Sequence, residues 1–140
     1  MNEGEFLYQI VGLAMAIQRE LGPDHAEIVY HRAMLDALGK DGISVADRPS
    51  LPVRRAGKLL AEYQPDTIAR KDGLTLILEY KAEARLHNAA LRQVRAYLSA
   101  YPEPAVGLLI NFGGPSLAWR QVRASRSNLP TTSRHTDVSK

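Results

Sequence analysis

The amino-acid sequence predicts a mixed β-sheet with helices packed against it, on the border between the α/β and α+β classes. Apolar residues recur at helical spacing in three segments, residues 5–21, 25–38 and 87–100. Between residues 43 and 81, and again after residue 106, short apolar or alternating runs lie between turn residues, as is typical of strands. The order of two helices, four strands, a helix and two strands predicts a strand–helix–strand crossover whose two strands are parallel.

The helices are defined by apolar stripes and by the residues at their ends. Gly22-Pro23 ends the first, whose stripe consists of Phe6, Ile10, Leu13, Ala14, Ile17 and Leu21. The second is expected to take Asp24 as its N-cap and to end near Gly39. The third carries an apolar face made of Leu91, Val94 and Leu98.

The strands are short and bounded by turn signals. Residues 43–45 and 51–53 alternate, residues 59–63 follow a turn at 56–58, and residues 106–110 are wholly apolar. A last strand is expected over residues 117–122. After that, Ser, Thr, Arg and Pro dominate, so we expect one domain over residues 1–124 and a basic, disordered tail over residues 125–140.

The most informative segment is a hairpin. Asp72-Gly73 lies between two apolar runs, which is the strongest short-range signal for a two-residue hairpin turn. With these residues at the turn, pairing positions sum to 145, so Asp66 lies opposite Glu79. Lys81 is two residues beyond Glu79 and shares its face of the strand. Two carboxylates and one ammonium are therefore expected to meet at one end of the hairpin.

This cluster has two interpretations. Adjacent carboxylates repel each other unless a cation lies between them, and their oxygen atoms suit a hard cation such as Mg²⁺. Alternatively, a charged trio at strand ends is an ordinary solvated surface cluster. The strand over residues 74–80 is apolar on both faces and is therefore expected to be covered on both sides, where charges are costly without partners.

Two helical residues could add to the cluster. Glu27 falls on the same side of its helix as Tyr30 and Met34, so it is a third carboxylate if that side faces the sheet. It could equally be a first-turn glutamate stabilised by the helix dipole. Gln93 shares a side with Tyr97 on the third helix, where it could hold a water or a phosphate, or could simply be solvated.

Composition narrows the class of protein. The 140 residues fit one domain, and the absence of cysteine excludes disulfide scaffolds, cysteine-bound zinc and iron–sulfur chemistry. The cysteine content fits a cytoplasmic protein, the acidic first residues are unlike a signal peptide, and no apolar run approaches a membrane span of about 18 residues. We therefore expect no contact with a membrane.

Positive charge is unevenly distributed. The net charge is +3, but the last 21 residues hold five basic side chains and one acidic one, which leaves residues 1–119 with a net charge of −1. The basic tail could attach to nucleic acid or could only aid solubility. Arg85, Arg92 and Arg95 add positive charge near the third helix, or form a solvated helix face.

These residues resemble a known pattern. Pro65-Asp66, Glu79-Tyr80-Lys81 and Gln93 are similar to the signature of the PD-(D/E)xK nuclease superfamily. Five segments in sequence order resemble the small GxxExxY family within it: IQRELGPDHAEIVYHRAM, LAEYQPD, LILEYKA, QVRAYL and GLLINFGGPSLAWRQV. The resemblance covers residues 5–123. The glycine that opens the family motif is Asp24 here, and a histidine that relatives often carry is Ala90.

The resemblance implies a restriction-endonuclease-like fold and a role for each matching residue. Asp66 and Glu79 would be metal ligands, together with the main-chain carbonyl of Tyr80. Lys81 would be catalytic, and Gln93 would act beside it. The cofactor would be Mg²⁺, with Mn²⁺ as a substitute.

Further residues are placed around this centre. Glu27 is expected to be catalytic and a further candidate metal ligand, and it should point toward the cluster instead of into solvent. The residues expected to contact the substrate are Tyr30, Arg92, Arg95 and Tyr97. The four histidines show no metal-ligand spacing and are interpreted as surface or packing residues.

The expected function is metal-dependent hydrolysis of phosphodiester bonds, by an endo- or exonuclease acting on DNA more than on RNA. The alternative is a weak or inactive nuclease-like module that binds nucleic acid or a protein partner. Because the body of the protein is nearly neutral, tight binding to duplex nucleic acid is not expected from it alone. A second copy of the chain or a protein partner is therefore expected to supply specificity.

Overall fold

The computed structural model describes residues 1–125 and 138–139. The helices are α1 (Glu3–Leu21), α2 (Glu27–Lys40) and α3 (Asn88–Ala100). The strands are β1 (Ser44–Asp47), β2 (Leu51–Arg55), β3 (Lys58–Tyr63), β4 (Thr67–Lys71), β5 (Leu74–Lys81), β6 (Val106–Asn111), β7 (Ala118–Val122) and β8 (Val138–Ser139). Every predicted helix and strand is present, but five strands lie between α2 and α3 where the sequence predicted four, and β8 was not predicted.

A six-stranded mixed sheet forms the centre, in the order β1-β4-β5-β6-β7-β8. Strands β5 and β6 are parallel, as the crossover through α3 predicts, and the other neighbours are antiparallel. The predicted fold class, a mixed sheet flanked by helices, is confirmed. The parallel pair matters for function because β5 and β6 end at the same edge of the sheet.

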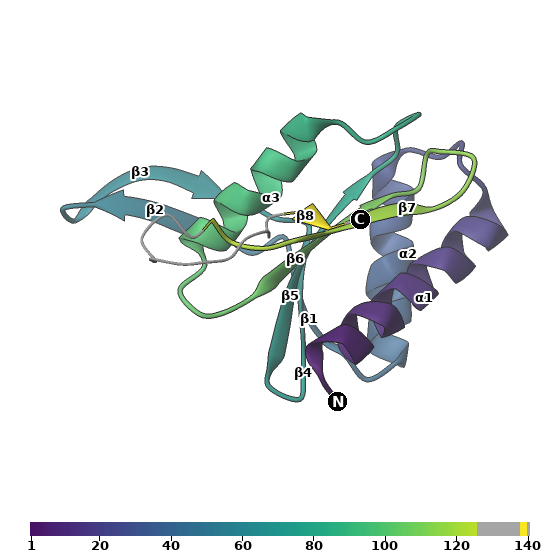
Figure 1. Ribbon diagram of the computed structural model, residues 1–140, viewed down its shortest axis with the longest axis horizontal. Helices are drawn as coiled ribbons and strands as arrows, with labels where there is room; N and C mark the ends of the chain where they lie inside the picture. The colour runs from purple at the N-terminus through teal and green to yellow at the C-terminus, as the bar shows by residue number, and fades with distance from the viewer. Residues whose placement is uncertain (126–137, 140) are drawn as a thin grey trace.

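Helices cover both faces of the sheet (Figure 1). One core lies between the sheet and helices α1 and α2, and contains Leu76, Leu78 and Tyr80 of β5. The second core lies under α3 and contains Ile77 of the same strand. The expectation that this strand is covered on both sides is therefore confirmed, and the charges at its end lie beside two apolar layers.

The helix starts differ from the predicted ones. Helix α1 begins earlier, because Asn2 and Glu5 form a reciprocal capping box that satisfies two main-chain N–H groups. Helix α2 begins at Glu27 with Ala26 as its N-cap, and no side chain caps it. The prediction that Asp24 caps this helix was wrong.

Strands β2 and β3 form a separate two-stranded sheet. In Figure 1 this hairpin extends to the left of the molecule, away from the central sheet. We call residues 51–63 the arm. Leu51 at its base belongs to the core under α3, and the Tyr63 ring lies 5.9 Å from that of Tyr97. The sequence predicted the two strands and not their separation from the main sheet.

A buried asparagine organises the loop that follows β5. The Asn111 side chain accepts a hydrogen bond from the Glu83 main-chain N–H at 2.9 Å and donates one to the Glu83 carbonyl at 2.9 Å. It also accepts from the Gly113 N–H at 3.2 Å. These bonds hold the loop just after Lys81 against the end of β6.

Substituting Gly113 with alanine should destabilise the protein by about 1–3 kcal/mol, as overpacking does. A Cβ at this position would lie 2.4 Å from the Glu83 nitrogen and 2.5 Å from the Ala82 carbonyl carbon, so main chain would have to move. Thermal and urea unfolding measure the change. Gly12→Ala is the control, because nothing lies within 4 Å of its added Cβ and alanine favours a helix. Equal stability of the two variants would contradict the close approach.

Most of the predicted tail, residues 125–140, lies outside the described residues. Within it, the main chain of Val138 and Ser139 pairs with β7. Among the residues that the structure describes, no helix has the length and apolar character needed to cross a membrane.

Candidate active site

The hairpin forms with the predicted register. Asp72 and Gly73 have φ values of 52° and 77°, as a tight two-residue turn requires, and Thr67 pairs with Leu78. Asp66 precedes the first residue of β4, and its main-chain N–H donates a hydrogen bond to Glu79 Oε1 at 3.2 Å. Asp66 and Glu79 therefore lie opposite each other, as predicted, where β4 begins and β5 ends.

Glu79 is a buried carboxyl group beside a lysine. The residue is 6% exposed, and its Oε2 lies 3.8 Å from Lys81 Nζ. The pKa of Glu79 is raised from 4.5 to about 8, first by burial of the carboxyl group and second by the charge of Asp66. The Lys81 ammonium lowers this pKa by a smaller amount. The lysine therefore offsets only part of the combined effect of burial and of the neighbouring carboxylate on Glu79.

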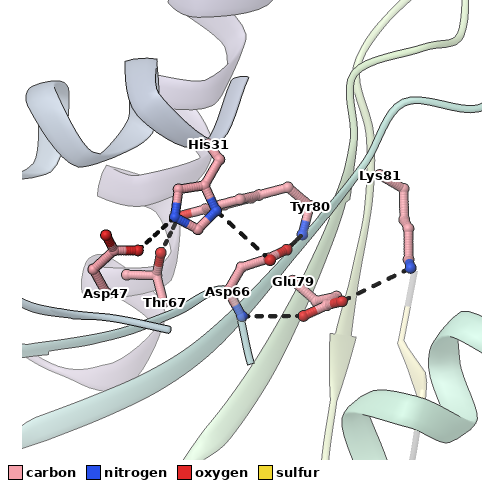
Figure 2. A network of polar contacts seen from close by, with 7 residues as sticks. All are labelled: His31, Asp47, Asp66, Thr67, Glu79, Tyr80 and Lys81. Atoms are coloured by element: carbon pink, nitrogen blue, oxygen red, sulfur yellow. Dashed lines mark hydrogen bonds and ion pairs between the residues drawn. The ribbon is translucent and has the colours of Figure 1, made fainter. Parts of the chain in front are cut away.

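The Asp66 carboxylate lies between helix α2 and strand β5 and contacts both. Its Oδ2 accepts a hydrogen bond from the Tyr80 main-chain N–H at 2.8 Å, and its Oδ1 lies 3.6 Å from His31 Nδ1. Figure 2 shows Asp66 between His31 on one side and Glu79 on the other. These contacts fix the carboxylate at the edge of the sheet.

The sequence did not predict the buried histidine of this network. His31 lies on α2, is 3% exposed, and its Nε2 forms a 2.7 Å hydrogen bond with Asp47 Oδ1 on β1. It thus bridges Asp47 and Asp66. A signal was available, because His31 is four residues after Glu27 and therefore on the same side of α2.

The Tyr80 side chain extends the network into the core. Its hydroxyl donates to Thr67 Oγ1 at 3.1 Å, and its ring meets that of His31 edge-on at 5.5 Å. Burial raises the pKa of Tyr80, so the hydroxyl stays protonated. The Tyr80 ring therefore packs against the His31 ring and restricts its orientation.

Gln93 and Lys81 line the same hollow, of about 420 Å³, where β5 ends beside α3. Ala90 and His87 also line it, and His87 Nε2 lies 3.9 Å from Glu83 Oε1. The structure therefore brings the predicted glutamine and lysine together. The Ala90 position faces the hollow as well, so its small side chain leaves that part of the surface open.

Glu27 is exposed, contrary to the expectation that it would turn away from solvent. Its charge nevertheless raises the pKa of Glu79, although less than the charge of Asp66 does. Arg92 is exposed on α3 and Arg95 is half-buried. Glu27 is thus a solvated carboxylate that acts on the site electrostatically.

The two tyrosines expected to contact substrate are core residues, which corrects that expectation. Tyr30 is 0% exposed, stacks on Phe112 at 4.5 Å, and its hydroxyl donates to the Gly22 carbonyl. Tyr97 is 4% exposed. Its burial, followed by the charges of Glu79 and Asp66, raises its pKa, so its hydroxyl stays protonated. Neither ring offers a surface to a nucleic acid.

The model of the PD-(D/E)XK nuclease superfamily matches residues 4–123 of this chain. The chain belongs to the PD-(D/E)XK nuclease superfamily. The crystal structure of SSO0001 matches this superfamily member with a TM-score of 0.55 and 15% identity, over 70% of this chain and 50% of that one. The match thus spans half the length of SSO0001, and it supports a shared fold.

A second solved structure is Hjc from Archaeoglobus fulgidus, a Holliday junction resolvase from an archaeal hyperthermophile. It matches this PD-(D/E)XK protein with a TM-score of 0.38 and 21% identity, over 66% of this chain and 72% of that chain. No curated protein sequence matches significantly.

PD-(D/E)XK nucleases generally use divalent metals, and the donor atoms present fit a hard cation. Within residues 1–125, no group of three or more His, Cys, Asp or Glu side chains is arranged to hold a metal. Mg²⁺, however, is usually held by one or two carboxylates together with water and substrate phosphates. Asp66 and Glu79 supply two such carboxylates, and the charge of Asp66 is, after burial, the second cause of the raised pKa of Glu79.

The stability of the metal-free protein should depend on pH through Glu79. Folding raises the pKa of this carboxyl from 4.5 to about 8, so between these values the folded protein keeps a proton that the unfolded chain loses. The free energy of unfolding should therefore fall as pH rises through this window, by at most about 1.4 kcal/mol per pH unit. Urea unfolding in EDTA measures the slope. Glu79→Gln should flatten it, and an equal slope in this variant would contradict the assignment.

Proposed function

We propose that this protein is a metal-dependent nuclease that hydrolyses phosphodiester bonds in DNA, of the GxxExxY type within its superfamily. The observation that carries the proposal is the contact between the Asp66 N–H and Glu79, with Lys81 Nζ 3.8 Å from the same glutamate. These groups meet at the edge of the sheet where β5 and β6 both end. Lys81 also lines the hollow beside α3, so the site borders a depression on the surface.

Asp66 and Glu79 would hold the cation, with the Tyr80 carbonyl as a third ligand. When bound, the cation would stabilise charge on the phosphate oxygens and make an attacking water more acidic. Glu27 is exposed and close enough to influence Glu79, so we assign it to the solvent side of the same site, as a further ligand or a proton acceptor.

Lys81 would stabilise the negative charge that develops on the phosphate. Its 3.8 Å separation from Glu79 Oε2 keeps the ammonium beside the ligands without making it one. Gln93 lines the same hollow as Lys81 and would position a water or a phosphate oxygen there. Arg92, exposed on α3, would contact the sugar–phosphate backbone of the substrate.

Metal-stripped protein incubated with single- and double-stranded DNA and RNA, with Mg²⁺, Mn²⁺ or EDTA, tests the proposal. We expect DNA cleavage with either metal and none with EDTA. Melting with and without metal is a second measurement. Because a cation favours ionised Glu79, the gain in melting temperature should be larger above pH 8 than below it. If neither metal changes the melting temperature, above or below pH 8, the result would contradict a metal site.

The second candidate is a weakly active module that binds nucleic acid or a protein partner. The raised pKa of Glu79 favours it, because this carboxyl is protonated near neutral pH until a cation displaces the proton. A second copy of the chain or a protein partner would then complete the specificity. Binding of DNA without cleavage under every metal and pH condition would favour this candidate.

A further inference from the structure

The tip of the arm carries positive charge that no acidic side chain of the described residues neutralises. Arg54, Arg55 and Lys58 are all exposed there. Within residues 1–125 none of the three forms an ion pair. No acidic residue occurs between residues 51 and 61. Since residues 1–119 have a net charge of −1, three cations on one short projection are a local departure from a nearly neutral body.

The arrangement of these cations is unfavourable for the isolated hairpin. Arg55 pairs directly with Lys58 across the turn formed by Ala56 and Gly57. Like charges placed opposite each other on antiparallel strands destabilise the pair. Because no carboxylate of the described chain relieves this repulsion, an external polyanion would.

The arm is connected to the candidate active site at its base. Strand β3 ends at Tyr63, three residues before Asp66, so the arm leads directly into a metal ligand. Leu51 and Tyr63 pack under α3, the helix that also contributes Gln93 to the hollow beside Lys81. The arm and the hollow therefore belong to the same face of the sheet, and the tip lies beyond it (Figure 1).

We propose that the arm is a duplex-DNA contact, in which the two-stranded ribbon enters the major groove and Arg54, Arg55 and Lys58 contact phosphates. This inference rests on the proposed function and identifies its substrate as double-stranded DNA. Five residues of strand span about 16 Å, and the major groove of B-form DNA is about 12 Å wide and admits a two-stranded ribbon. The arm is therefore long enough to cross the groove.

The same geometry discriminates between nucleic acids. The major groove of A-form RNA is deep and narrow, so a ribbon does not enter it. A single strand has no groove and can contact the cations only through its backbone. The arm should therefore favour duplex DNA over duplex RNA of the same sequence.

The test removes the three charges together. In EDTA, which prevents metal-dependent cleavage, fluorescence anisotropy gives the dissociation constant for a short DNA duplex over a range of salt concentrations. The triple variant Arg54→Gln, Arg55→Gln, Lys58→Gln should bind at least about tenfold more weakly at about 50 mM salt. Each phosphate contact contributes about 0.9 to the salt slope, so the slope should fall by about 2.7. Between about 50 and 200 mM salt the wild type should lose about 40-fold more affinity than the variant does.

The matched control removes the same charge from the opposite face. Arg19, Arg32 and Lys40 are exposed on α1 and α2, and their triple glutamine variant should keep the wild-type salt slope. Circular dichroism checks that both variants are folded. Equal slopes for the arm variant and the wild type would overturn the proposal, as would an equal loss of affinity in both triple variants. Loss of affinity for duplex RNA as large as that for duplex DNA would also overturn it.

Two further measurements separate the possible failures. If the wild type cleaves DNA while the arm variant keeps full affinity, the proposed function stands and the arm proposal fails. If the wild type neither binds nor cleaves any nucleic acid, both fail. Leu59 and Leu60 are also exposed on the arm, by 45% and 59%, so sedimentation is measured in parallel. A change of oligomeric state with unchanged DNA affinity would assign the arm to a protein contact and overturn the proposal.

Discussion

Replacing Asp66 with asparagine should abolish DNA cleavage while leaving the fold intact. The substitution removes one of the two carboxylates that would hold the cation but keeps a carbonyl oxygen to accept from the Tyr80 N–H. Because metal stabilisation of transition-state charge is worth several kcal/mol, the rate should fall by at least about 10³-fold. A cleavage assay with saturating Mn²⁺ and a melting curve measure the two effects.

Asp72→Asn is the matched control for this substitution. It makes the same change at the other end of the same hairpin, and Asn-Gly is as favourable as Asp-Gly in this turn. Its cleavage rate should equal that of the wild type. Asp66→Asn should also lower the pKa of Glu79, because the charge of Asp66 helps to raise it. Cleavage by Asp66→Asn at the wild-type rate would exclude Asp66 as a metal ligand.

Alanine is a less informative substitution at position 66. It would leave the Tyr80 N–H without its acceptor, which costs about 1–3 kcal/mol if the group stays buried. It would also relieve the repulsion that raises the pKa of Glu79. These opposing effects make the stability of Asp66→Ala a poor measure of the carboxylate repulsion. Asp66→Asn removes the repulsion but keeps the acceptor for the Tyr80 N–H, so its stability measures the repulsion alone.

Replacing Lys81 with methionine should separate catalysis from metal binding. The ammonium lies 3.8 Å from Glu79 Oε2, so it can stabilise charge on a phosphate held at the same ligands. Loss of such an electrostatic contribution lowers the rate by about 10²–10³-fold. Cleavage kinetics and calorimetric titration with Mn²⁺, compared in one buffer, measure the two properties.

The metal affinity of Lys81→Met should depend on pH. Lys81 lowers the pKa of Glu79, so in the variant a proton competes more strongly near neutral pH. Above the pKa of Glu79 the affinity should equal or exceed that of the wild type, because a competing cation has gone. Lys71→Met, at the turn end of the hairpin, is the control and should change neither property. An unchanged cleavage rate in Lys81→Met would remove this lysine from the mechanism.

Local sequence signals predicted the hairpin and its charged end. Asp72-Gly73 fixed the turn, the turn fixed the register, and the register placed Asp66 beside Glu79. Each step depends only on residues adjacent in sequence or directly opposed across two strands. The period of two likewise placed Ile77 on the opposite face from its apolar neighbours.

The contacts that sequence reasoning missed join segments far apart in the chain. His31 on α2 meets Asp47 on β1 and Asp66 beside β4, and the packing of the helix on the sheet decides this meeting. The burial of Tyr30 also depends on tertiary packing, because its partner Phe112 follows β6. Helical spacing placed both α2 residues correctly on one helix and could not show what they would face.

The turn between β4 and β5 has a consequence for how this protein can vary. It lies at the opposite end of the hairpin from Glu79, about 17 Å away for the five residues of β4. Exposed loops usually tolerate changes of length. Here an added residue would shift the pairing by one position and send Asp66 or Glu79 to the wrong face of the sheet. Substitutions in this turn should therefore be tolerated while insertions and deletions are not, so the length of a remote loop is as much a requirement for the candidate active site as the carboxylates themselves.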